Sequence, residues 1–557
     1  MFHIFKSSTV LAILAKKKFM LRSILFTIVA VFSLHAQEVP NDYLTPAFHE
    51  ERRQAVRTQM PPNSVAVFFA NPVRNRANDV DFHYHQDPNF YYLTGLKEPH
   101  AVLLIYKEPQ VVDGVAMHDV LFVQERDPLL EQWDGYRLGI TGAKEKLGFS
   151  NVFFNTQFSD FKTDFERFDQ VLFFDFNNDV RDDTRNEADL YSLINSFKEK
   201  AKFPVNYNIE KASLYRYITT SDVNSSANVA QVLSRSLRTN KDLAQDELLS
   251  AYHTAINERQ RTELKQQMSA QLTNLDTQTL PMIMDNLREI KLLEELVLLK
   301  KAIYISAVGQ VEVMKAMHPG MSEREIQGIH EFVFKKYGAE YEGYPSIVGA
   351  GHNGCVLHYK KNNDFADNNE LILMDVGAEF HGYTADVTRT IPVNGIFSEE
   401  QKKIYEIVYK AQEAGISYAT IGSSKSKIHS VAYNEIAKGL INLKIIDNIR
   451  DARIYFPHGT VHHIGLDVHD LNTNSYFKEN SVITVEPGIY IPEGSKCDKK
   501  WWGIAIRIED DVLISKNGPV ILSDGSPRKW NEIEDLMKQP SVLDDFELPK
   551  ISPLLNN

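Results

Sequence analysis

Two aspartates, Asp375 and Asp386, occupy strand-like runs that are close in the sequence. The first run, 371–376, is apolar, and the second, 383–391, is rich in Thr, Val and Ile, as β-strands are. Two carboxylates that meet in an otherwise apolar hairpin repel each other, which raises the pKa of one of them unless positive charge lies between them. A pair of divalent ions about 3.5–4 Å apart, as in two-metal hydrolases, would supply that charge.

The turn between the two runs decides whether these carboxylates meet. Gly377 and Gly382 are residues that chains use to turn, so we expect a β-hairpin. A turn centred between Phe380 and His381 would make the two aspartates cross-strand partners, with Cβ atoms about 4.5–5.5 Å apart on one face. The alternative is an exposed hairpin that two acids merely flank, and the hairpin alone does not exclude it.

Four histidines fall within one short segment further along the chain. They are His458, His462, His463 and His469. Imidazole is the commonest metal ligand, although a single histidine in a fold is usually structural or merely exposed. Four of them beside Gly459 and Gly465, which allow close backbone approach, make a much stronger signal for a metal or catalytic site.

Two glutamates follow at the ends of predicted strands. Glu486 ends an apolar run and precedes a Pro-Gly turn, and Glu509 lies in the run 504–511. Strand alternation places Arg507 and Glu509 on one face, and an acid that faces the interior of a sheet needs a partner. Each glutamate alone could be an ordinary strand end. With the aspartates and histidines, they give four carboxylates and at least one imidazole.

Composition bounds what else the chain can be. A length of 557 residues predicts two or three domains, and 43% hydrophobic and 24% charged residues are typical of a globular protein. The net charge of −13 argues against a nucleic-acid binder. Two cysteines, Cys355 and Cys497, exclude a disulfide framework and a cysteine-based zinc site.

The N-terminus has the features of a targeting segment. After Met20 come a basic residue, the apolar run 24–34 and the small residue Ala36, as in a secretory signal peptide. The run is short for a transmembrane helix, and Leu34 is large for its place before the cleavage point. We expect export to the periplasm, with a membrane-anchored or a cytoplasmic protein as the alternatives. The true start is open between Met1 and Met20.

The elements that must position these residues follow from hydrophobic spacing. The first half is predicted to be mixed α/β, with a helix at 49–60 and strands at 64–70, 101–106, 115–124 and 171–176. The aromatic stretch 82–95 is predicted to be a core strand that ends at Gly95, and 131–139 is predicted to be a loop. The second half is predicted to have a polar helical stretch at 209–280 and helices at 285–317, 398–419 and 427–443.

The C-terminal part resembles the pita-bread metallopeptidases, which include aminopeptidase P, prolidase, methionine aminopeptidase and the metal-free creatinase. The family's ligand order of Asp, Asp, His, Glu and Glu is matched by Asp375, Asp386, His462, Glu486 and Glu509. Within the histidine segment, the family's ligand lies three residues before the glycine of Gly-Leu-Asp-Val-His-Asp, which selects His462 and not His463. The resemblance covers about residues 285–530.

The N-terminal half resembles the N-terminal domain of creatinase and aminopeptidase P. The matching segments are Phe90-Tyr-Tyr-Leu-Thr-Gly95 and Trp133-Asp-Gly-Tyr-Arg-Leu-Gly139, and the second is more similar to aminopeptidase P than to prolidase. The fold class is therefore predicted as α/β (α+β), a creatinase-like mixed α/β domain followed by a pita-bread catalytic domain. The predicted boundaries are a signal or targeting segment at 1–36, the N-terminal domain at 38–208, a polar helical insertion or linker at 209–284, the pita-bread domain at 285–530 and a tail at 531–557.

The resemblance implies a cofactor of two divalent metal ions. An oxygen-rich set with one imidazole suits Mn²⁺, although Zn²⁺ or Co²⁺ could also bind. The family pattern implies that Asp375 holds one ion, that His462 and Glu486 hold the other, and that Asp386 and Glu509 bridge the two.

Further roles follow from the same resemblance. His358 and His469 would hydrogen-bond the substrate and the tetrahedral intermediate, and Glu486 would carry a proton to the leaving prolyl nitrogen. Arg507 would orient the ligand shell. The predicted substrate-binding residues are His458, Arg507 and Trp133.

The implied activity is hydrolysis of the N-terminal Xaa-Pro bond in peptides that carry proline second, by a homodimer or homotetramer in which Trp133 reaches a neighbour's site. Prolidase is the alternative, because it shares all five ligands. Methionine aminopeptidases lack so large an N-terminal half. A metal-free creatinase-type enzyme or a non-catalytic binding module would lose ligands, whereas all five positions carry the expected residue types here.

Overall fold

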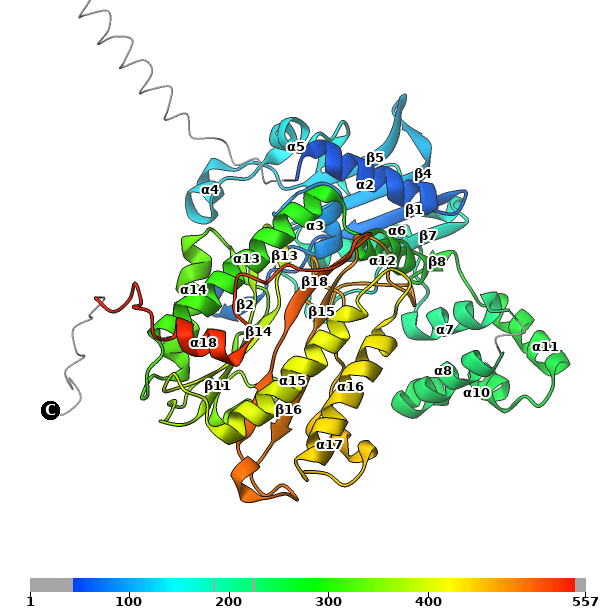
Figure 1. Cartoon of the computed structure of the whole chain (residues 1–557). Coiled ribbons are helices and arrows are strands. Elements are labelled where there is room, and N and C mark those ends of the chain that lie inside the picture. Colours follow the sequence, from blue (N-terminus) through cyan, green and yellow to red (C-terminus); the bar gives the residue numbers. More distant parts are fainter. Residues whose placement is uncertain (1–43, 184–185, 223–225, 546–557) are drawn as a thin grey trace, which may run out of the picture. The chain divides into compact units, whose positions relative to one another are not determined.

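The computed structural model describes residues 44–183, 186–222 and 226–545 (Figure 1). The predicted targeting segment at 1–36 and the last part of the predicted tail, 546–557, lie outside the described residues. No helix within the described ranges combines the length and the hydrophobicity that crossing a membrane requires.

A six-stranded mixed sheet forms the centre of the N-terminal half, with the strand order β6-β5-β4-β1-β7-β8. The bounds are β1 (Ser64–Phe69), β4 (Val102–Val112), β5 (Val115–Val123), β6 (Val152–Phe154), β7 (Gln170–Phe173) and β8 (Leu275–Asp276). β4 runs antiparallel to its neighbours β1 and β5, while β1, β7 and β8 pair in parallel. Alternate β1 residues enter two different hydrophobic clusters, so both faces of the sheet are covered. The strands predicted at 64–70, 101–106, 115–124 and 171–176 are confirmed.

Helices and a small hairpin surround this sheet (Figure 1). Their bounds are α2 (Pro46–Gln59), β2 (Asn75–Ala77), β3 (Val80–Asp81), α3 (Pro88–Thr94), α4 (Pro128–Asp134), α5 (Gly139–Leu147) and α6 (Leu190–Lys200). The helix predicted at 49–60 is confirmed as α2. The loop predicted at 131–139 is wrong in its first part, because Asp127 accepts a hydrogen bond from the Leu129 N–H at 2.8 Å and caps α4.

The aromatic stretch around residues 90–92 is helical, so the predicted core strand is wrong. Asp87 caps the N-terminus of α3 by accepting a hydrogen bond from the Phe90 N–H at 2.8 Å, and Pro88 fills the first turn. Gly95 ends the helix in the left-handed conformation, at φ 70°. The aromatics are buried as expected, but on a helix whose two end signals outweigh their strand propensity.

A helical segment separates β7 from β8. It contains α7 (Ile209–Thr220), α8 (Ser226–Thr239), α9 (Lys241–Ala244), α10 (Glu247–Thr254) and α11 (Glu258–Ser269), which agrees with the predicted polar helical stretch. These helices enclose a hydrophobic cluster of their own. The chain then returns through β8 to the edge of the N-terminal sheet.

The helix predicted at 285–317 is wrong as one piece, because it is two helices, α12 (Thr279–Glu289) and α13 (Leu293–Ala316). The break at 290–292 has a tertiary cause. The Lys291 N–H donates to the Asn480 carbonyl at 3.0 Å, and the Lys291 ammonium donates to Asp470 at 2.6 Å. Glu295 then accepts a hydrogen bond from the Leu292 N–H at 2.9 Å, which caps α13.

The C-terminal half combines small antiparallel sheets with helices. The strands are β9 (Tyr341–Glu342), β10 (Ile347–Ala350), β11 (Leu371–Val376), β12 (Ala378–Phe380), β13 (Tyr383–Thr384), β14 (Val387–Pro392), β15 (Val482–Val485), β16 (Gly488–Ile491), β17 (Ile504–Arg507), β18 (Asp510–Ser515) and β19 (Gly518–Ile521). The helices are α14 (Glu323–Lys336), α15 (Glu399–Ser417), α16 (Lys425–Asn442), α17 (Ala452–Tyr455) and α18 (Trp530–Leu536). α13 packs on α14, and α15 packs on α16, which confirms the helices predicted at 398–419 and 427–443.

The hairpin forms, but its turn lies one residue later than predicted. His381 and Gly382 both have positive φ, at 50° and 88°, which is the conformation of a type I′ turn. The register therefore pairs Asp375 with Thr388, and the expected direct pairing of the two aspartates is wrong. Asp386 lies two residues from Thr388, so it is a diagonal neighbour of Asp375 on the same face.

Candidate metal centre

The two aspartates converge on one tyrosine. The Tyr344 hydroxyl lies 2.6 Å from Asp375 Oδ1 and 2.5 Å from Asp386 Oδ1. A hydroxyl carries a single proton, so it can donate to only one of two carboxylates at a time. The second close contact therefore requires a proton on a carboxyl group or a cation that holds both carboxylates in place.

The three remaining predicted ligands join the same cluster. His462 Nε2 lies 3.5 Å from Asp386 Oδ2 and 3.7 Å from Glu486 Oε1. Asp386, His462 and Glu509 each offer a ligand atom within 4.8 Å of the others, which is a geometry that could hold a metal ion. The structure therefore brings together all five predicted ligands, three in this group, Asp375 through Tyr344 and Glu486 through His462.

Backbone and hydroxyl groups fix the direction of these ligands. His462 Nδ1 lies 3.0 Å from the His463 carbonyl, which leaves Nε2 directed at the carboxylates. The Thr388 hydroxyl donates to Glu509 Oε2 at 2.6 Å. Arg507 donates from Nη2 to Asp375 Oδ2 at 2.5 Å. Each ligand thus enters the site with one oxygen or nitrogen already positioned.

Burial and nearby like charges raise the pKa values of several carboxyl groups in the site. Burial, with the charges of the neighbouring aspartates, raises the pKa of Glu486 to about 8 and that of Glu509 well above its usual range. Burial and Asp386 likewise raise the pKa of Asp375 to about 6, against the opposing effect of Arg507. Such a set of carboxylates fits divalent cations, because cations between them would remove the repulsion and let all four ionise.

The histidine responds in the opposite sense. Burial alone would lower the pKa of His462, but the hydrogen bond and charge of Asp386 and the charge of Glu486 outweigh it and raise the pKa to about 9. The same contact with His462 overcomes the effect of burial on Asp386 and lowers its pKa. The contact between His462 and Asp386 therefore favours the charged form of both groups.

A second series of close contacts links the ligand residues to one another. Arg507 Nη1 donates to the Tyr490 hydroxyl at 2.8 Å, and His458 Nε2 lies 2.9 Å from the same oxygen. His458 Nδ1 lies 3.5 Å from Glu486 Oε2. Contacts through Arg507, Tyr490 and His458 thus run from Asp375 to Glu486.

Tyr344 and Tyr490 are site residues that the sequence reasoning missed. Tyr490 lies in β16, beyond the Pro-Gly turn that follows Glu486, so strand alternation from Glu486 does not predict where its side chain lies. Tyr344 lies between β9 and β10 and has no sequence signal either, because only the folded chain brings it to the hairpin.

The predicted substrate residues His358 and His469 differ from Trp133 in whether an interaction in the described ranges links them to the ligand cluster. His469 and His358 are exposed, and the His469 ring packs edge-on against His462 with centroids 4.3 Å apart. Behind the effect of burial, the charge of His358 contributes to lowering the pKa values of both His458 and His469. Trp133 lies on α4 and is 85% exposed, and no contact in the described part of the chain joins it to these residues.

A cluster of buried charged residues binds the histidine segment at Asp470. Asp470, next to His469, accepts hydrogen bonds from Arg288 at 2.5 Å and from Lys291 at 2.6 Å. A Cβ on Gly465 would collide with the ends of the Asp470 and Lys291 side chains, so a larger residue there would displace this buried pair. Arg288 also donates to Asn89 of α3 at 2.9 Å, which ties the N-terminal half to this segment.

Comparison with protein families gives two matches. Residues 297–516 match metallopeptidase family M24, and residues 49–171 match the N-terminal domain of aminopeptidase P. All five predicted ligands lie inside the first match.

Individual relatives cover nearly the whole chain. The Xaa-Pro aminopeptidase of Escherichia coli (strain K12) is 32% identical over 88% of this chain and 97% of its own length. The structure of aminopeptidase P from E. coli with the inhibitor Pro-Leu matches with a TM-score of 0.68 and 29% identity, covering 89% of this chain and 98% of that one. A structure of the zinc-substituted E. coli enzyme in complex with product matches with the same values.

The Tyr344 hydroxyl is predicted to matter for metal affinity. Tyr344→Phe removes the contact to both aspartates, and loss of such an outer contact costs about 10–100-fold in metal affinity or activity. Calorimetric titration of the metal-stripped protein with Mn²⁺ measures the effect. Tyr341→Phe is the matched control, because its hydroxyl donates to the Tyr84 carbonyl at 2.8 Å, away from the ligands. Equal affinities in the two variants would contradict the prediction.

Metal uptake is predicted to release protons. Glu486 and His462, with pKa values of about 8 and about 9, hold their protons at pH 7, and metal binds the deprotonated forms. The apparent affinity therefore rises as pH increases through this range and is lost as pH falls below it. Titrations at pH 7 in two buffers of different protonation enthalpy count the protons. Binding at pH 7 without proton release would show that these groups are already deprotonated.

Proposed function

Because the chain belongs to metallopeptidase family M24, in its aminopeptidase P branch, we propose that it removes the first residue from peptides that carry proline second. The supporting observation is that one buried site gathers all five ligand residues in a chain whose full length matches an Xaa-Pro aminopeptidase. The bond before proline lacks an N–H group, so a peptidase that reads this group binds it poorly and a dedicated enzyme is needed.

The ligand residues would hold two divalent ions, which we propose to be Mn²⁺ because carboxylates outnumber imidazoles in the set. Asp386 is the natural shared ligand, since its Oδ1 faces Tyr344 and Asp375 while its Oδ2 faces His462. Glu509 would be the second shared ligand. When bound, such ions polarise a carbonyl group and lower the pKa of water.

The surrounding side chains would handle the substrate and the proton. Glu486 is a half-buried carboxylate at the edge of the cluster, where it can pass a proton to the leaving prolyl nitrogen. The imidazoles of His358 and His469 are exposed, and they would donate hydrogen bonds to the carbonyl oxygen as charge develops on it. His458 and Arg507 would form part of the wall around the substrate.

We also propose that the chain acts as a homodimer or homotetramer. The α4 region carries large apolar side chains in water, with Leu129 74%, Trp133 85% and Tyr136 90% exposed. Exposed apolar groups of this size are typical of a surface that another protein covers. Trp133 would then contribute to a neighbour's substrate site.

The residues before Gln37 support export, and we propose a periplasmic location. Their basic start and apolar run have the composition of a signal peptide. Sequencing the N-terminus of the mature protein recovered from a periplasmic extract tests this, because an intact N-terminus in the cytoplasmic fraction would contradict it.

Peptide hydrolysis distinguishes the candidate activities. We expect the protein with Mn²⁺ to release free Xaa from an Xaa-Pro-Yaa tripeptide, and a chelator to abolish this release. An Xaa-Pro dipeptide and an Xaa-Ala-Yaa tripeptide are the matched substrates. Liquid chromatography of the products gives the result. Cleavage of the dipeptide alone would identify a prolidase, and no cleavage despite bound metal would contradict the proposed function.

Trp133 tests the oligomer. We expect the wild-type protein to sediment as a dimer or tetramer, and Trp133→Ser to shift it towards the monomer and lower its activity, because an exposed aromatic anchor is lost. Tyr304→Ser is the control, since Tyr304 is 58% exposed on α13. Analytical ultracentrifugation makes the measurement, and a fully active wild-type monomer would contradict the proposal.

A further inference from the structure

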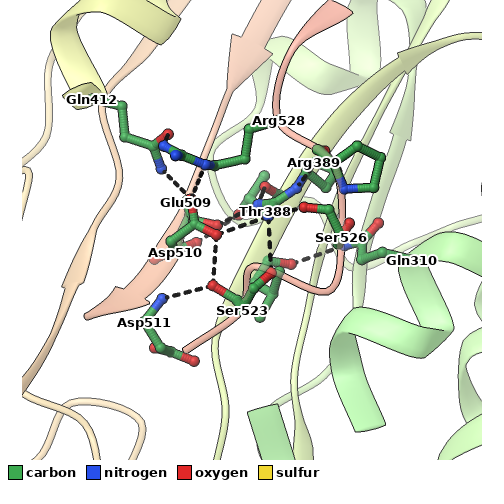
Figure 2. Close-up of polar contacts among 12 residues, drawn as sticks. Gln310, Thr388, Arg389, Gln412, Glu509, Asp510, Asp511, Ser523, Ser526 and Arg528 are labelled. Atoms are coloured by element: carbon green, nitrogen blue, oxygen red, sulfur yellow. Dashed lines mark hydrogen bonds and ion pairs between the residues drawn. The ribbon is translucent and has the colours of Figure 1, made fainter. Parts of the chain in front are cut away.

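Arg389 lies next to the proposed ligand Glu509, and each nitrogen of its guanidinium group donates a hydrogen bond (Figure 2). Its side chain is fully buried. Nε donates to the Pro527 carbonyl at 3.0 Å, and Nη1 donates to the Thr388 carbonyl at 2.9 Å and to the Glu509 carbonyl at 2.6 Å. Nη2 donates to Asp510 Oδ1 and to the Ser526 carbonyl. These five shorter bonds account for the five N–H groups of a guanidinium, and Nη2 has a longer contact of 3.5 Å with the Ser523 carbonyl.

Asp510 is equally buried and equally satisfied. Oδ1 accepts from Arg389 at 2.8 Å and from the Ser523 hydroxyl at 2.5 Å. Oδ2 accepts from the Gln412 amide at 2.8 Å and faces Arg528 Nε at 3.3 Å. Figure 2 shows these groups gathered around the Asp510 carboxylate. The Asp510 carboxylate is thus contacted by side chains from α15, β14 and the segment after β19.

The Arg389–Asp510 pair is connected to Glu509 in two ways. Arg389 binds the Glu509 carbonyl directly, and it also binds the carbonyl of Thr388. The Thr388 hydroxyl in turn donates to the Glu509 carboxylate at 2.6 Å. Both the backbone and the ligand oxygens of Glu509 therefore depend on where Arg389 holds β14 against β18.

The same network extends to Glu486 and Asp386. Gln412 donates to Asp510 and, at 3.1 Å, to the carbonyl of Val485, the residue before Glu486. The Ser523 hydroxyl, bonded to Asp510, also accepts from the Asp511 N–H at 3.2 Å. Asp511 Oδ2 then accepts from the Asp386 N–H at 3.0 Å. One buried ion pair therefore connects to the backbone around three proposed metal ligands.

We propose that Arg389 and Asp510 are positioning residues that set the spacing of Asp386, Glu486 and Glu509 and thereby the metal affinity and turnover of the enzyme. The proposal rests on the metallopeptidase function put forward above. A purely structural ion pair could be replaced at little cost, since buried pairs contribute little net stability over apolar packing. A pair bonded to the backbone beside three ligands would instead transmit any distortion to the site.

The chain offers a matched control in a second buried ion pair. Arg53 has a side chain that is 2% exposed, and its Nε binds Asp119 Oδ2 at 2.9 Å. It also donates to a backbone carbonyl, that of Leu93, at 2.8 Å. This pair joins α2 to β5 in the N-terminal half and has no contact with the proposed ligands in the described part of the chain.

The test compares Arg389→Lys with Arg53→Lys in the full-length protein. Lysine keeps the charge but cannot make five directed bonds. Mn²⁺ titration of the metal-stripped proteins, thermal unfolding, and kcat and KM for an Xaa-Pro-Yaa peptide are measured. We expect Arg389→Lys to weaken Mn²⁺ binding or lower kcat about 10–100-fold, with KM changed less than about twofold. Arg53→Lys should lower the unfolding midpoint alone.

Two outcomes overturn different claims. If Arg389→Lys and Arg53→Lys lower the unfolding midpoint alike and neither changes Mn²⁺ affinity or kcat, the positioning role is wrong. If the wild-type protein itself neither binds Mn²⁺ nor cleaves the peptide, the proposed function fails and the inference falls with it.

A milder variant covers the case in which Arg389→Lys does not fold. Ser523→Ala removes one donor to Asp510 and the acceptor for the Asp511 N–H, while the Arg389–Asp510 contact remains. We expect a severalfold loss of Mn²⁺ affinity in a folded protein. Unchanged affinity and kcat in Ser523→Ala would overturn the proposal.

Discussion

Repulsion among four carboxylates is the constraint on which the catalytic half depends. Asp375, Asp386, Glu486 and Glu509 come from different strands, and each would separate from the others if it were free to move. The structure opposes this with fixed donors, among them Tyr344, the Thr388 hydroxyl and Arg507. Folding thus places the four carboxyl groups close together, and because their repulsion and burial raise the pKa values of Asp375, Glu486 and Glu509, cations between them would favour the ionised forms.

The surrounding polar groups are arranged in shells around that charge. Next to the ligands lie hydroxyls and Arg507, and behind them lie the fully buried ion pairs Arg389–Asp510 and, under the histidine segment, Arg288–Asp470. Burying an ion pair is costly unless its remaining hydrogen bonds are satisfied. The remaining bonds of Arg389 go mainly to backbone carbonyls beside the ligands, so satisfying this pair also fixes the neighbouring loops. Arg288 instead binds the side chains of Asn89, Asp467 and Asp470.

The sequence predicted much of this site because the ligands are chemically conspicuous. Residue types and spacing indicated four carboxylates and a histidine-rich segment, and the resemblance to the metallopeptidase family then selected His462 within that segment and the order of the five ligands. The hairpin register could not be predicted, because a turn at His381-Gly382 and one a residue earlier satisfy the same glycine pattern. The break between α12 and α13 was missed because its cause, the ties from Lys291 to Asn480 and Asp470, lies far along the chain. Tyr344 was missed for the same reason.

The bond from Arg288 to Asn89 has a consequence for how the chain can be divided. Arg288 also carries the histidine segment through Asp470, so a residue of the N-terminal half satisfies part of a charge buried under the catalytic loop. In a catalytic half without the N-terminal half, the Arg288 guanidinium group would lack its hydrogen bond to Asn89. It would then be exposed on a surface that the N-terminal half covers in the full chain. The N-terminal half therefore helps to fix the geometry of this loop through the contact between Asn89 and Arg288.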